Sequence, residues 1–585
     1  MKINTLFFLI FLSIICLAQK EKTNEIQDTT DSTKAAIDIN NIWLPLDNRG
    51  VLGDVPLGDS LIANGMYDDE VFLFSGGFYL SGYSSGDMWG NGIARTDRIE
   101  DYQPGLVGSS PDSSINLVYQ IRSTDPPFGS TWQAWKDAVS LGAKFYDGNE
   151  DGVYNPIDLN SNGLWDVNED KPDFQGDQTA WCVYNDGVTR ENRIYDVGSQ
   201  GIEIRQSVFA SDGHGNMFDD IIFIRYEVTN TGSAADILDS VYFAAMADAD
   251  LGDYLDDLAS VDTVEQSGIA YNSGEDDDFG INPPAFFVKQ LQGPPVFIPG
   301  ETFIDNDSDG EFTSGIDTPL DSAVAKHGKY LGEYYIAGAI NNPITAFTVY
   351  HGLPNYDHPN NPQALRNYLI GGLNTIGEPL DPCTWFVGNG STLPNCNSIN
   401  PRFMYSGDPV SGNGWMNIAP LDNIFVLSTG PFKLKIGEPV ELIYAYIVGR
   451  GTDHLNSITK AREISQFVQM VYDNNFENLP TGIDDDKNLI ADEFMLYQNY
   501  PNPFNPVTTI KYTIPALGVG NENFRSIQIT IFDILGRKIK TLVSEQKPAG
   551  TYEVQFDASQ LSSGVYFYQL SAGSFIQTKK LMLLK

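Results

Sequence analysis

The sequence predicts a mostly β protein, with antiparallel β-sandwich domains, acidic loop insertions, a few helices and a separate β-sandwich at the C-terminus. Three observations lead to this fold class. Short runs alternate between apolar and polar side chains, and the connections between them are rich in Gly, Pro, Asp and Asn. Apolar residues make up 42% of the chain and aromatic residues 12%, which is enough to fill substantial cores. At 585 residues, the chain exceeds the usual size of one domain.

The clearest strands are DIIFIRYEVTNTG, which starts at Asp220, and PVELIYAYIVGRG, which starts at Pro439. Alternate residues of each are apolar, so one face is predicted to point into a core. The core-facing residues are Ile222, Ile224, Tyr226 and Val228 in the first strand and Val440, Leu442, Tyr444, Tyr446 and Val448 in the second.

One segment after these strands, SITKAREISQFVQMVYDNNF, is predicted to be a helix. Its apolar residues recur at helical spacing and form one stripe, which we expect to pack on the sheet. The stripe consists of Ile458, Ala461, Ile464, Val468 and Val471.

The chain begins with a pattern typical of an export signal. Residues 1–18 hold one Lys followed by an apolar run that is too short to span a bilayer, and Ala18 offers a small residue for cleavage. Residues 19–40 are polar and lack periodicity, which predicts a flexible leader. No later run is long and apolar enough for a transmembrane helix. We therefore expect an exported protein without a transmembrane segment.

The charge balance is strongly acidic. The chain has 77 Asp and Glu against 35 Lys and Arg, for a net charge of −42. Such a surface repels nucleic acid and attracts cations, so we exclude nucleic acid as a partner.

Three cysteines remain outside the export signal. Cys383 and Cys396 enclose a short segment, and in an oxidising exterior they are predicted to form a disulfide. A pair of reduced cysteines is the alternative. Cys182 is then the odd cysteine, and we expect it to be buried rather than reactive.

The stretch DGNEDGVYNPIDLNSNGLWDVNED, residues 147–170, crowds carboxylates together and has almost no core-forming residues. Oxygen-bearing side chains recur at alternate positions and are followed by Gly, which is the pattern of an EF-hand-type calcium loop. The first loop comprises Asp147, Asn149, Asp151, Val153, Asn155 and Asp158, and the second comprises Asp158, Asn160, Asn162, Leu164, Asp166 and Glu169. Val153 and Leu164 are expected to contribute backbone carbonyls. Asp158 is thus predicted to close one loop and open the next, with no room for helices between them.

The pair resembles the linked calcium loops of dockerin-like or thrombospondin type 3-like segments. A third copy of the pattern occurs at residues 305–317, where the twelfth position is Ile316 and Asp317 is expected to substitute for it. Its candidate ligands are Asp305, Asp307, Asp309, Glu311 and Asp317. Calcium is therefore the predicted cofactor, and solvated acidic loops are the alternative interpretation. The aspartates of residues 247–262 fit no loop template, so a further calcium site and a solvated loop both stay open there.

Residues 481–494 are polar and acidic and are predicted to be a linker. Residues 495–585 beyond it hold nine Lys and Arg against five Asp and Glu, and such a reversal of charge marks an independent module. The region before the linker, residues 41–480, is predicted to be β-rich and to contain more than one sandwich.

The C-terminal module carries several spaced motifs. They are YPNPFNP from Tyr500, DILGR from Asp533, GTY from Gly550, SGVY from Ser563 and KKL from Lys579. The prolines hold the first motif extended, and DILGR suits a hairpin turn. Together the motifs resemble the type A C-terminal sorting domain of type IX secretion cargo, which is found in Bacteroidetes and their Ignavibacteria-like relatives.

This resemblance implies an immunoglobulin-like β-sandwich that binds the type IX secretion machinery through residues 495–585. It also implies cleavage in the preceding linker, followed by release or by attachment to the outer cell surface. The central segments FIRYEVTNTGS and FMYSGDPVSGNGW resemble uncharacterised secreted proteins with the same tail, which implies no activity.

The sequence indicates only a class of function. We expect a secreted, calcium-stabilised, surface-displayed β protein with a structural, adhesive or binding role, and surface polysaccharide or extracellular matrix as its partner. The alternative is an extracellular hydrolase acting on polysaccharide or protein. No catalytic residue can be nominated, because Gly82–Gly86 matches the nucleophile-elbow pattern without the strand and helix that would position Ser84. A cleft with aromatic walls and two convergent carboxylates would favour the hydrolase.

Overall fold

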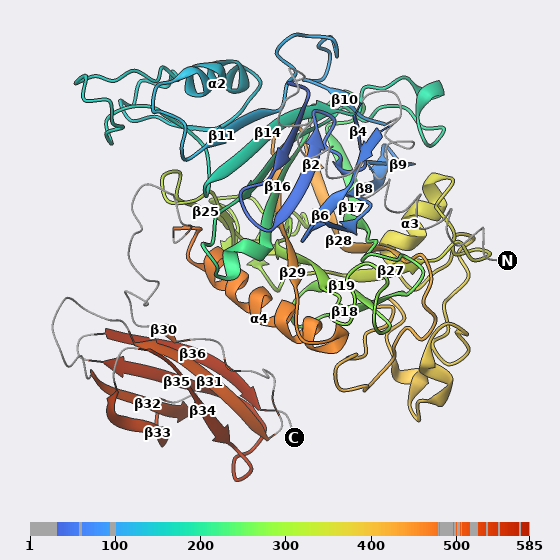
Figure 1. Ribbon diagram of the computed structural model, residues 1–585, viewed down its shortest axis with the longest axis vertical. Helices are drawn as coiled ribbons and strands as arrows, with labels where there is room; N and C mark the ends of the chain where they lie inside the picture. Colours follow the sequence, from blue (N-terminus) through green and yellow to red (C-terminus); the bar gives the residue numbers. More distant parts are fainter. Residues whose placement is uncertain are drawn as a thin grey trace. The chain divides into compact units, whose positions relative to one another are not determined.

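The structure is a computed structural model of the chain (Figure 1). It describes residues 32–57, 61–93, 101–477, 479, 495–496, 499, 504, 506–514, 525–533, 536–547, 550–572 and 575–583. The chain divides into two compact units, Met1–Ile483 and Asp484–Lys585. The predicted export signal, linker and tail-cleavage region lie outside the described residues.

The first unit contains a ten-stranded antiparallel sheet. Its order is β27–β28–β17–β8–β3–β2–β6–β7, with β1 beside β2 and β9 beside β8. The strands are β1 (Lys34–Ile37), β2 (Ile42–Asp47), β3 (Leu52–Gly53), β6 (Gly65–Tyr67), β7 (Glu70–Leu73), β8 (Ser75–Ser84), β9 (Asp87–Ile93), β17 (Ile237–Asp248), β27 (Ala346–Tyr350) and β28 (Ile424–Lys435). Because β17 pairs with β8 on one side and β28 on the other, distant parts of the chain lie side by side.

A nine-stranded antiparallel sheet forms the second layer. Its order is β10–β14–β15–β16–β29–β20–β19–β18, with β11 beside β14. The strands are β10 (Gln103–Pro104), β11 (Tyr119–Arg122), β14 (Gln178–Asn185), β15 (Ile202–Ala210), β16 (Ile221–Asn230), β18 (Asp257–Asp262), β19 (Ser267–Asn272), β20 (Ala285–Gln292) and β29 (Val440–Gly449). The two strands that the sequence marks most clearly, β16 and β29, pair at the centre of this sheet.

The two large sheets enclose one shared core. Phe78 of β8 contacts Tyr226 of β16 with ring centroids 5.3 Å apart, and Phe243 of β17 stacks on Tyr444 of β29 at 5.8 Å. The structure therefore differs from the expectation of several sandwiches within residues 41–480. One large sandwich forms because strands from throughout the region join the same two sheets.

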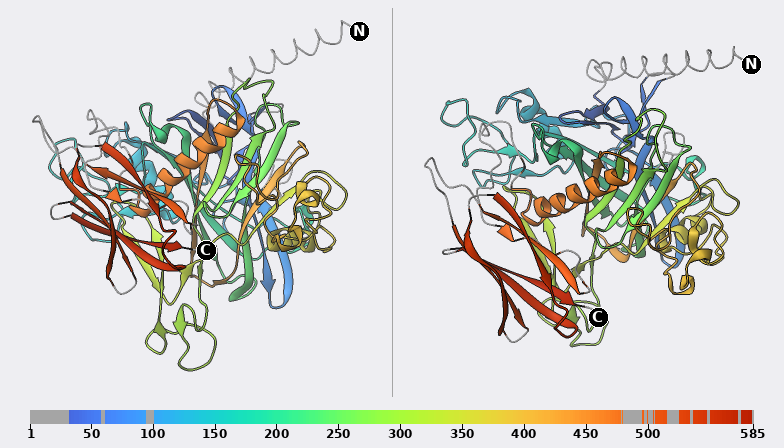
Figure 2. Two further views of the ribbon diagram at one scale, coloured as in Figure 1. Left: turned by 90° about the horizontal axis from the view of Figure 1, so that it is seen from below. Right: turned by 60° about the horizontal axis from the view of Figure 1, so that its bottom comes forward.

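The helix α4 (His454–Asp473) covers the other face of the nine-stranded sheet (Figure 2). Asp453 caps its first turn by accepting the backbone N–H groups of Leu455 and Asn456 at 3.0 and 2.9 Å. The predicted stripe packs there on alternate residues of β16 and β29, including Phe223 and Ile447. The alternation in these strands and the helical stripe are thus confirmed, and both faces of the sheet are buried.

Two further α-helices, α2 (Ser130–Ser140) and α3 (Pro362–Ile370), occur in the described chain. None of its helices is long and apolar enough to cross a membrane. The part of the predicted leader that the structure describes includes a strand of the ten-stranded sheet, β1, whose Ile37 is fully buried in the shared core. The apolar run AAI gives β1 a core-facing surface, so the ordered fold begins earlier than the sequence predicts.

Five short two-stranded ribbons complete the first unit. They are β4 (Val55–Leu57) with β5 (Leu61–Ala63), β12 (Phe145–Tyr146) with β13 (Lys171–Pro172), β21 (Pro295–Val296) with β26 (Ile340–Asn341), β22 (Phe303–Ile304) with β23 (Thr318–Pro319), and β24 (Ser322–Lys326) with β25 (Glu333–Ala337). The β12–β13 and β22–β23 ribbons bear the acidic stretches.

The second unit is a smaller β-sandwich, in agreement with the predicted fold class. A three-stranded sheet, β30–β31–β34, and a four-stranded sheet, β33–β32–β35–β36, contribute to one core. The strands are β30 (Met495–Leu496), β31 (Val507–Ile514), β32 (Arg525–Asp533), β33 (Lys538–Lys547), β34 (Gly550–Asp557), β35 (Gly564–Ala572) and β36 (Phe575–Leu583). β32 and β33, which flank DILGR, pair antiparallel, and Asp533 accepts hydrogen bonds from the backbone N–H and the Nε of Arg537 at 2.9 and 2.7 Å.

Candidate metal sites

Both acidic stretches are connections between the two strands of a short ribbon. The β12–β13 ribbon encloses residues 147–170, and the β22–β23 ribbon encloses residues 305–317. Tyr146 pairs with Lys171 at the end of the first ribbon, and the second ribbon has an equivalent pair. Antiparallel pairing therefore places the first and last residues of each acidic stretch opposite each other.

Each of the three predicted loops opens with an aspartate that accepts a backbone N–H from a glycine at loop position 6. The pairs are Asp147 with Gly152, Asp158 with Gly163 and Asp305 with Gly310, at 2.7, 2.7 and 2.9 Å. The three glycines have φ angles of 76°, 76° and 81°, in the left-handed region that glycine adopts without strain. The regular spacing of aspartate and glycine thus sets the same turn three times.

A second carboxylate closes each loop by accepting the backbone N–H groups of loop positions 2 and 9. In the second loop this residue is Glu169, and in the third it is Asp317. Glu169 binds Leu159 and Asp166 at 2.6 and 2.9 Å, and Asp317 binds Asn306 and Thr313 at 2.8 and 2.7 Å. Asp317 therefore takes the structural place expected of position 12.

The first loop differs from the sequence-based assignment. Asp170, rather than Asp158, accepts the backbone N–H groups of Gly148 and Asn155, at 3.2 and 2.7 Å. Asp158 uses its carboxylate within the second loop. The reason is the ribbon register, which places Asp170 opposite Asp147 at the base of the connection. Asp170 directly precedes β13, as Asp317 directly precedes β23, but this shared position becomes apparent only once the ribbons are known.

The other predicted ligands of the first two loops form hydrogen bonds with nearby groups. Asn149 and Asp151 accept the N–H groups of Asp151 and Val153 at 2.9 and 2.8 Å. Asn155 accepts from Lys136 Nζ at 3.2 Å. The Nδ2 groups of Asn160 and Asn162 both donate to Asp166 Oδ2, at 2.7 and 3.0 Å. Within residues 147–170, all of which are described, no three acidic side chains converge within 4.8 Å.

The third loop brings its carboxylates closer together. Asp305, Asp307 and Asp317 each place one carboxylate oxygen within 4.8 Å of the other two. Asp309 accepts the N–H of Glu311 at 2.8 Å. The Glu311 carboxylate pairs with Lys433 and Lys435, and the hydrogen bond with Lys433 lowers the pKa of Glu311. Glu311 is therefore left to contribute its backbone carbonyl, the group expected of loop position 7.

A half-exposed aromatic cluster that sequence reasoning missed anchors the first two loops. Tyr146, Trp165 and Tyr330 pack edge to face, with centroids 5.7 Å apart for the first two rings and 5.1 Å for the last two. Lys171 Nζ lies 4.2 Å from the centroid of the Tyr330 ring, and burial lowers the pKa of Lys171 to about 8. The cluster ties the acidic stretch to a segment that is distant in sequence.

The hydrolase alternative can be examined at two places in the first unit. Ser84 lies at the end of β8, in the hairpin to β9 where it pairs with Asp87, so no helix follows it. A surface pocket beside the Cys383–Cys396 segment is lined by neutral residues, among them Asn395, Ser398 and Trp415, and has no acidic side chain in its wall. Neither place supplies a catalytic arrangement.

The cysteines are as predicted. Cys383 and Cys396 form a disulfide. Cys182 is a free, fully buried cysteine on β14, and burial raises the pKa of its thiol.

Residues 498–584 match the secretion system C-terminal sorting domain family. The second unit therefore contains a type IX secretion sorting signal, which directs export and often attachment to the outer cell surface. A search of curated proteins found no match to the chain.

Proposed function

We propose that this type IX secretion cargo is a calcium-stabilised β protein, displayed at the outer cell surface, with a structural, adhesive or binding role. One observation carries the proposal: each of the three acidic loops opens with an aspartate, turns at a glycine and is closed by a carboxylate that binds equivalent backbone N–H groups. Such repetition is expected where each loop holds the same ligand.

Calcium fits the chemistry of these loops. It takes 6–8 oxygen ligands in flexible geometry, and carboxylates, amides and backbone carbonyls are its usual ligands in proteins. The loops offer these groups, including the carbonyls of Val153, Leu164 and Glu311 at position 7. The stretches contain many exposed residues, so without a cation their like charges oppose a compact loop. Calcium sites outside the cell are often weak, on the order of 10⁻⁴ to 10⁻³ M.

A binding role is supported by large exposed aromatic side chains on the first unit. Tyr335 is 68% exposed, its neighbour Tyr334 is 55% exposed and Phe386 is 70% exposed. Aromatic side chains with polar tips are enriched at interfaces because they offer a large contact area together with a hydrogen bond. We propose surface polysaccharide or extracellular matrix as the partner.

The calcium part of the proposal is tested by thermal unfolding of the secreted protein after chelator treatment. Restoring calcium to about 100 times its dissociation constant should stabilise the fold by about 2.7 kcal/mol per site. It should also protect residues 147–170 from protease, whereas magnesium at the same concentration should do much less. An unchanged melting curve together with no calcium binding by titration calorimetry would show that the stretches are only solvated loops.

The binding role has a separate test. Fluorescently labelled secreted protein should bind cells or extracted surface polysaccharide, and Tyr335→Ala with Tyr334→Ala should reduce that binding. Equal binding of the parent and the double variant would exclude Tyr334 and Tyr335 as contact residues.

A further inference from the structure

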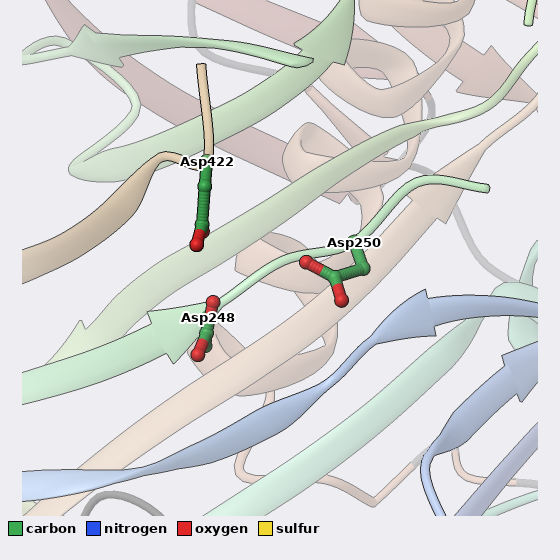
Figure 3. A group of neighbouring side chains, drawn as sticks. All are labelled: Asp248, Asp250 and Asp422. Carbon is green, nitrogen blue, oxygen red and sulfur yellow. The ribbon is translucent and has the colours of Figure 1, made fainter. Parts of the chain in front are cut away.

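Three aspartates outside the acidic loops converge where the ten-stranded sheet ends. Asp248 is the last residue of β17, Asp250 follows in the connection to β18, and Asp422 lies just before β28. Because Asp248 pairs with Ile424 of β28, the end of one strand lies beside the beginning of the other. Each aspartate places a carboxylate oxygen within 4.8 Å of the other two, as Figure 3 shows.

Two buried oxygens nearby have no hydrogen-bond partner. Asp257, the first residue of β18, is 1% exposed, and its Oδ1 is unpaired while its Oδ2 accepts the N–H of Leu251 at 3.0 Å. Asn272 is fully buried and pairs with Asp257 in the register of β18 and β19. Its Nδ2 donates to the carbonyl of Leu251 at 3.0 Å and to Asp256 Oδ1 at 2.6 Å, whereas its Oδ1 is unpaired. These bonds fix which amide atom is the oxygen.

The unpaired oxygen of Asp257 belongs to the same place as the three converging aspartates. Its carboxylate is held by Leu251, the residue after Asp250. Its backbone carbonyl accepts from Asn423 Nδ2 at 2.6 Å and from the N–H of Leu421 at 3.4 Å, and these residues flank Asp422. Asp257 thus lies between the two segments that supply Asp250 and Asp422. Within the described chain, neither Lys nor Arg donates a hydrogen bond to the unpaired oxygen of Asp257.

We propose that Asp248, Asp250, Asp422 and Asp257 form a separate divalent-cation site at the end of β17, with calcium as its ion. Buried acceptors are nearly always paired, so the unpaired carboxylate oxygen of Asp257, held between the segments that carry Asp250 and Asp422, indicates a positive partner. The group contains only oxygen ligands and no His or Cys, which favours calcium over zinc.

The ion would join the two layers of the sandwich. β17 and β28 belong to the ten-stranded sheet, whereas β18 and β19 belong to the nine-stranded sheet. The connection from β17 to β18 carries Asp250 from one sheet to the other, and an ion bound by residues of both sheets holds this end of the core closed. This site does not depend on the acidic loops, so either proposal can fail without the other.

Titration calorimetry of the calcium-stripped full-length protein tests the site. Asp250→Asn and Asp422→Asn should each bind one calcium ion fewer than the parent protein. Asp253→Asn is the matched control, because it removes the same charge from the same connection outside the group, and it should bind as many ions as the parent. Parent-like stoichiometry in both variants would overturn the proposal.

Anomalous diffraction from crystals of the parent protein grown with calcium gives a result that does not depend on how the variants fold. A calcium peak surrounded by the four carboxylates supports the site. Absence of a peak would overturn the proposal.

Discussion

Asp147 and Asp170 stand at the two ends of one acidic stretch, and the β12–β13 ribbon holds them opposite each other. Asp147 accepts the N–H groups of Asp151 and Gly152, and Asp170 accepts those of Gly148 and Asn155. Asp170 is 1% exposed, so the loop is closed by a carboxylate at the buried base of the ribbon. The second loop, opened by Asp158, is nested inside the first.

This nesting predicts that the first two loops lose calcium independently. Asp170→Asn should remove the ion of the first loop, and Asp158→Asn should remove only that of the second, because each substitution deletes a carboxylate used by one loop. Titration calorimetry should show one ion fewer in each variant and two fewer in the double variant. Loss of two ions from Asp158→Asn alone would restore the sequence-based assignment, in which Asp158 serves both loops.

Calcium binding at the third loop should depend on the side chain of Asp317 and not on that of Ile316. Asp317 bridges two backbone N–H groups and converges with Asp305 and Asp307, whereas the Ile316 side chain is 51% exposed. Asp317→Asn should weaken calcium binding at this loop by at least about tenfold, the equivalent of about 1.4 kcal/mol. Ile316→Ala should leave it unchanged. Titrations of the two variants side by side provide the comparison, and equal affinities would contradict the assignment.

The sorting domain predicts the fate of a truncated chain. Deletion of residues 495–585 should leave the first unit folded, because its two large sheets and its core are complete without the second unit. The truncated protein should accumulate in the periplasm, since it lacks the type IX signal. Cell fractionation checks this prediction, and efficient release of the truncated protein into the medium would contradict it.

Mass spectrometry of the parent protein should find a C-terminus upstream of Met495.

The disulfide should contribute to stability through its short loop. Replacing Cys383 and Cys396 by Ser should lower the free energy of unfolding by about 3 kcal/mol in the chain-entropy description. Urea denaturation of the parent and the double variant measures the difference. Cys182→Ser is the control, because it replaces a buried cysteine that is not part of the disulfide. A reducing agent should destabilise the Cys182 variant, which keeps the disulfide, but not the double variant, which lacks it.

His351 should make stability depend on pH. Burial lowers the pKa of His351 from 6.5 to about 4, so the unfolded chain takes up a proton that the folded chain does not. The contribution is fully present above pH 6.5 and is lost as the pH falls toward 4. The loss should reach about 3 kcal/mol, at 1.36 kcal/mol for each pKa unit.

His351→Gln provides the control for this prediction, because Gln can keep a hydrogen bond to the Tyr405 hydroxyl, which lies 3.1 Å from His351 Nε2. Urea denaturation at a series of pH values should give a flatter profile for this variant between pH 6.5 and 4. Parallel profiles for the two proteins would show that another group controls the dependence.

The sequence by itself determined the features that depend on neighbouring residues. Alternation fixed which faces of β16 and β29 enter the core, and helical spacing fixed the face of α4 that covers them. The aspartate–glycine spacing set the three loop turns, and the motifs of the C-terminal module identified the sorting domain. Each of these signals spans only a few turns or strands, so it can be read without knowledge of the rest of the fold.

Only the tertiary structure decided which distant residues meet. It assigned the closure of the first loop to Asp170, placed Asp422 beside Asp248, and merged the predicted sandwiches into one. The physical reason is strand pairing: the register of β12 with β13 and of β17 with β28 is set by the packing of the whole core. No local pattern encodes that register. The register is what brings Asp170 to the first loop and Asp422 to Asp248.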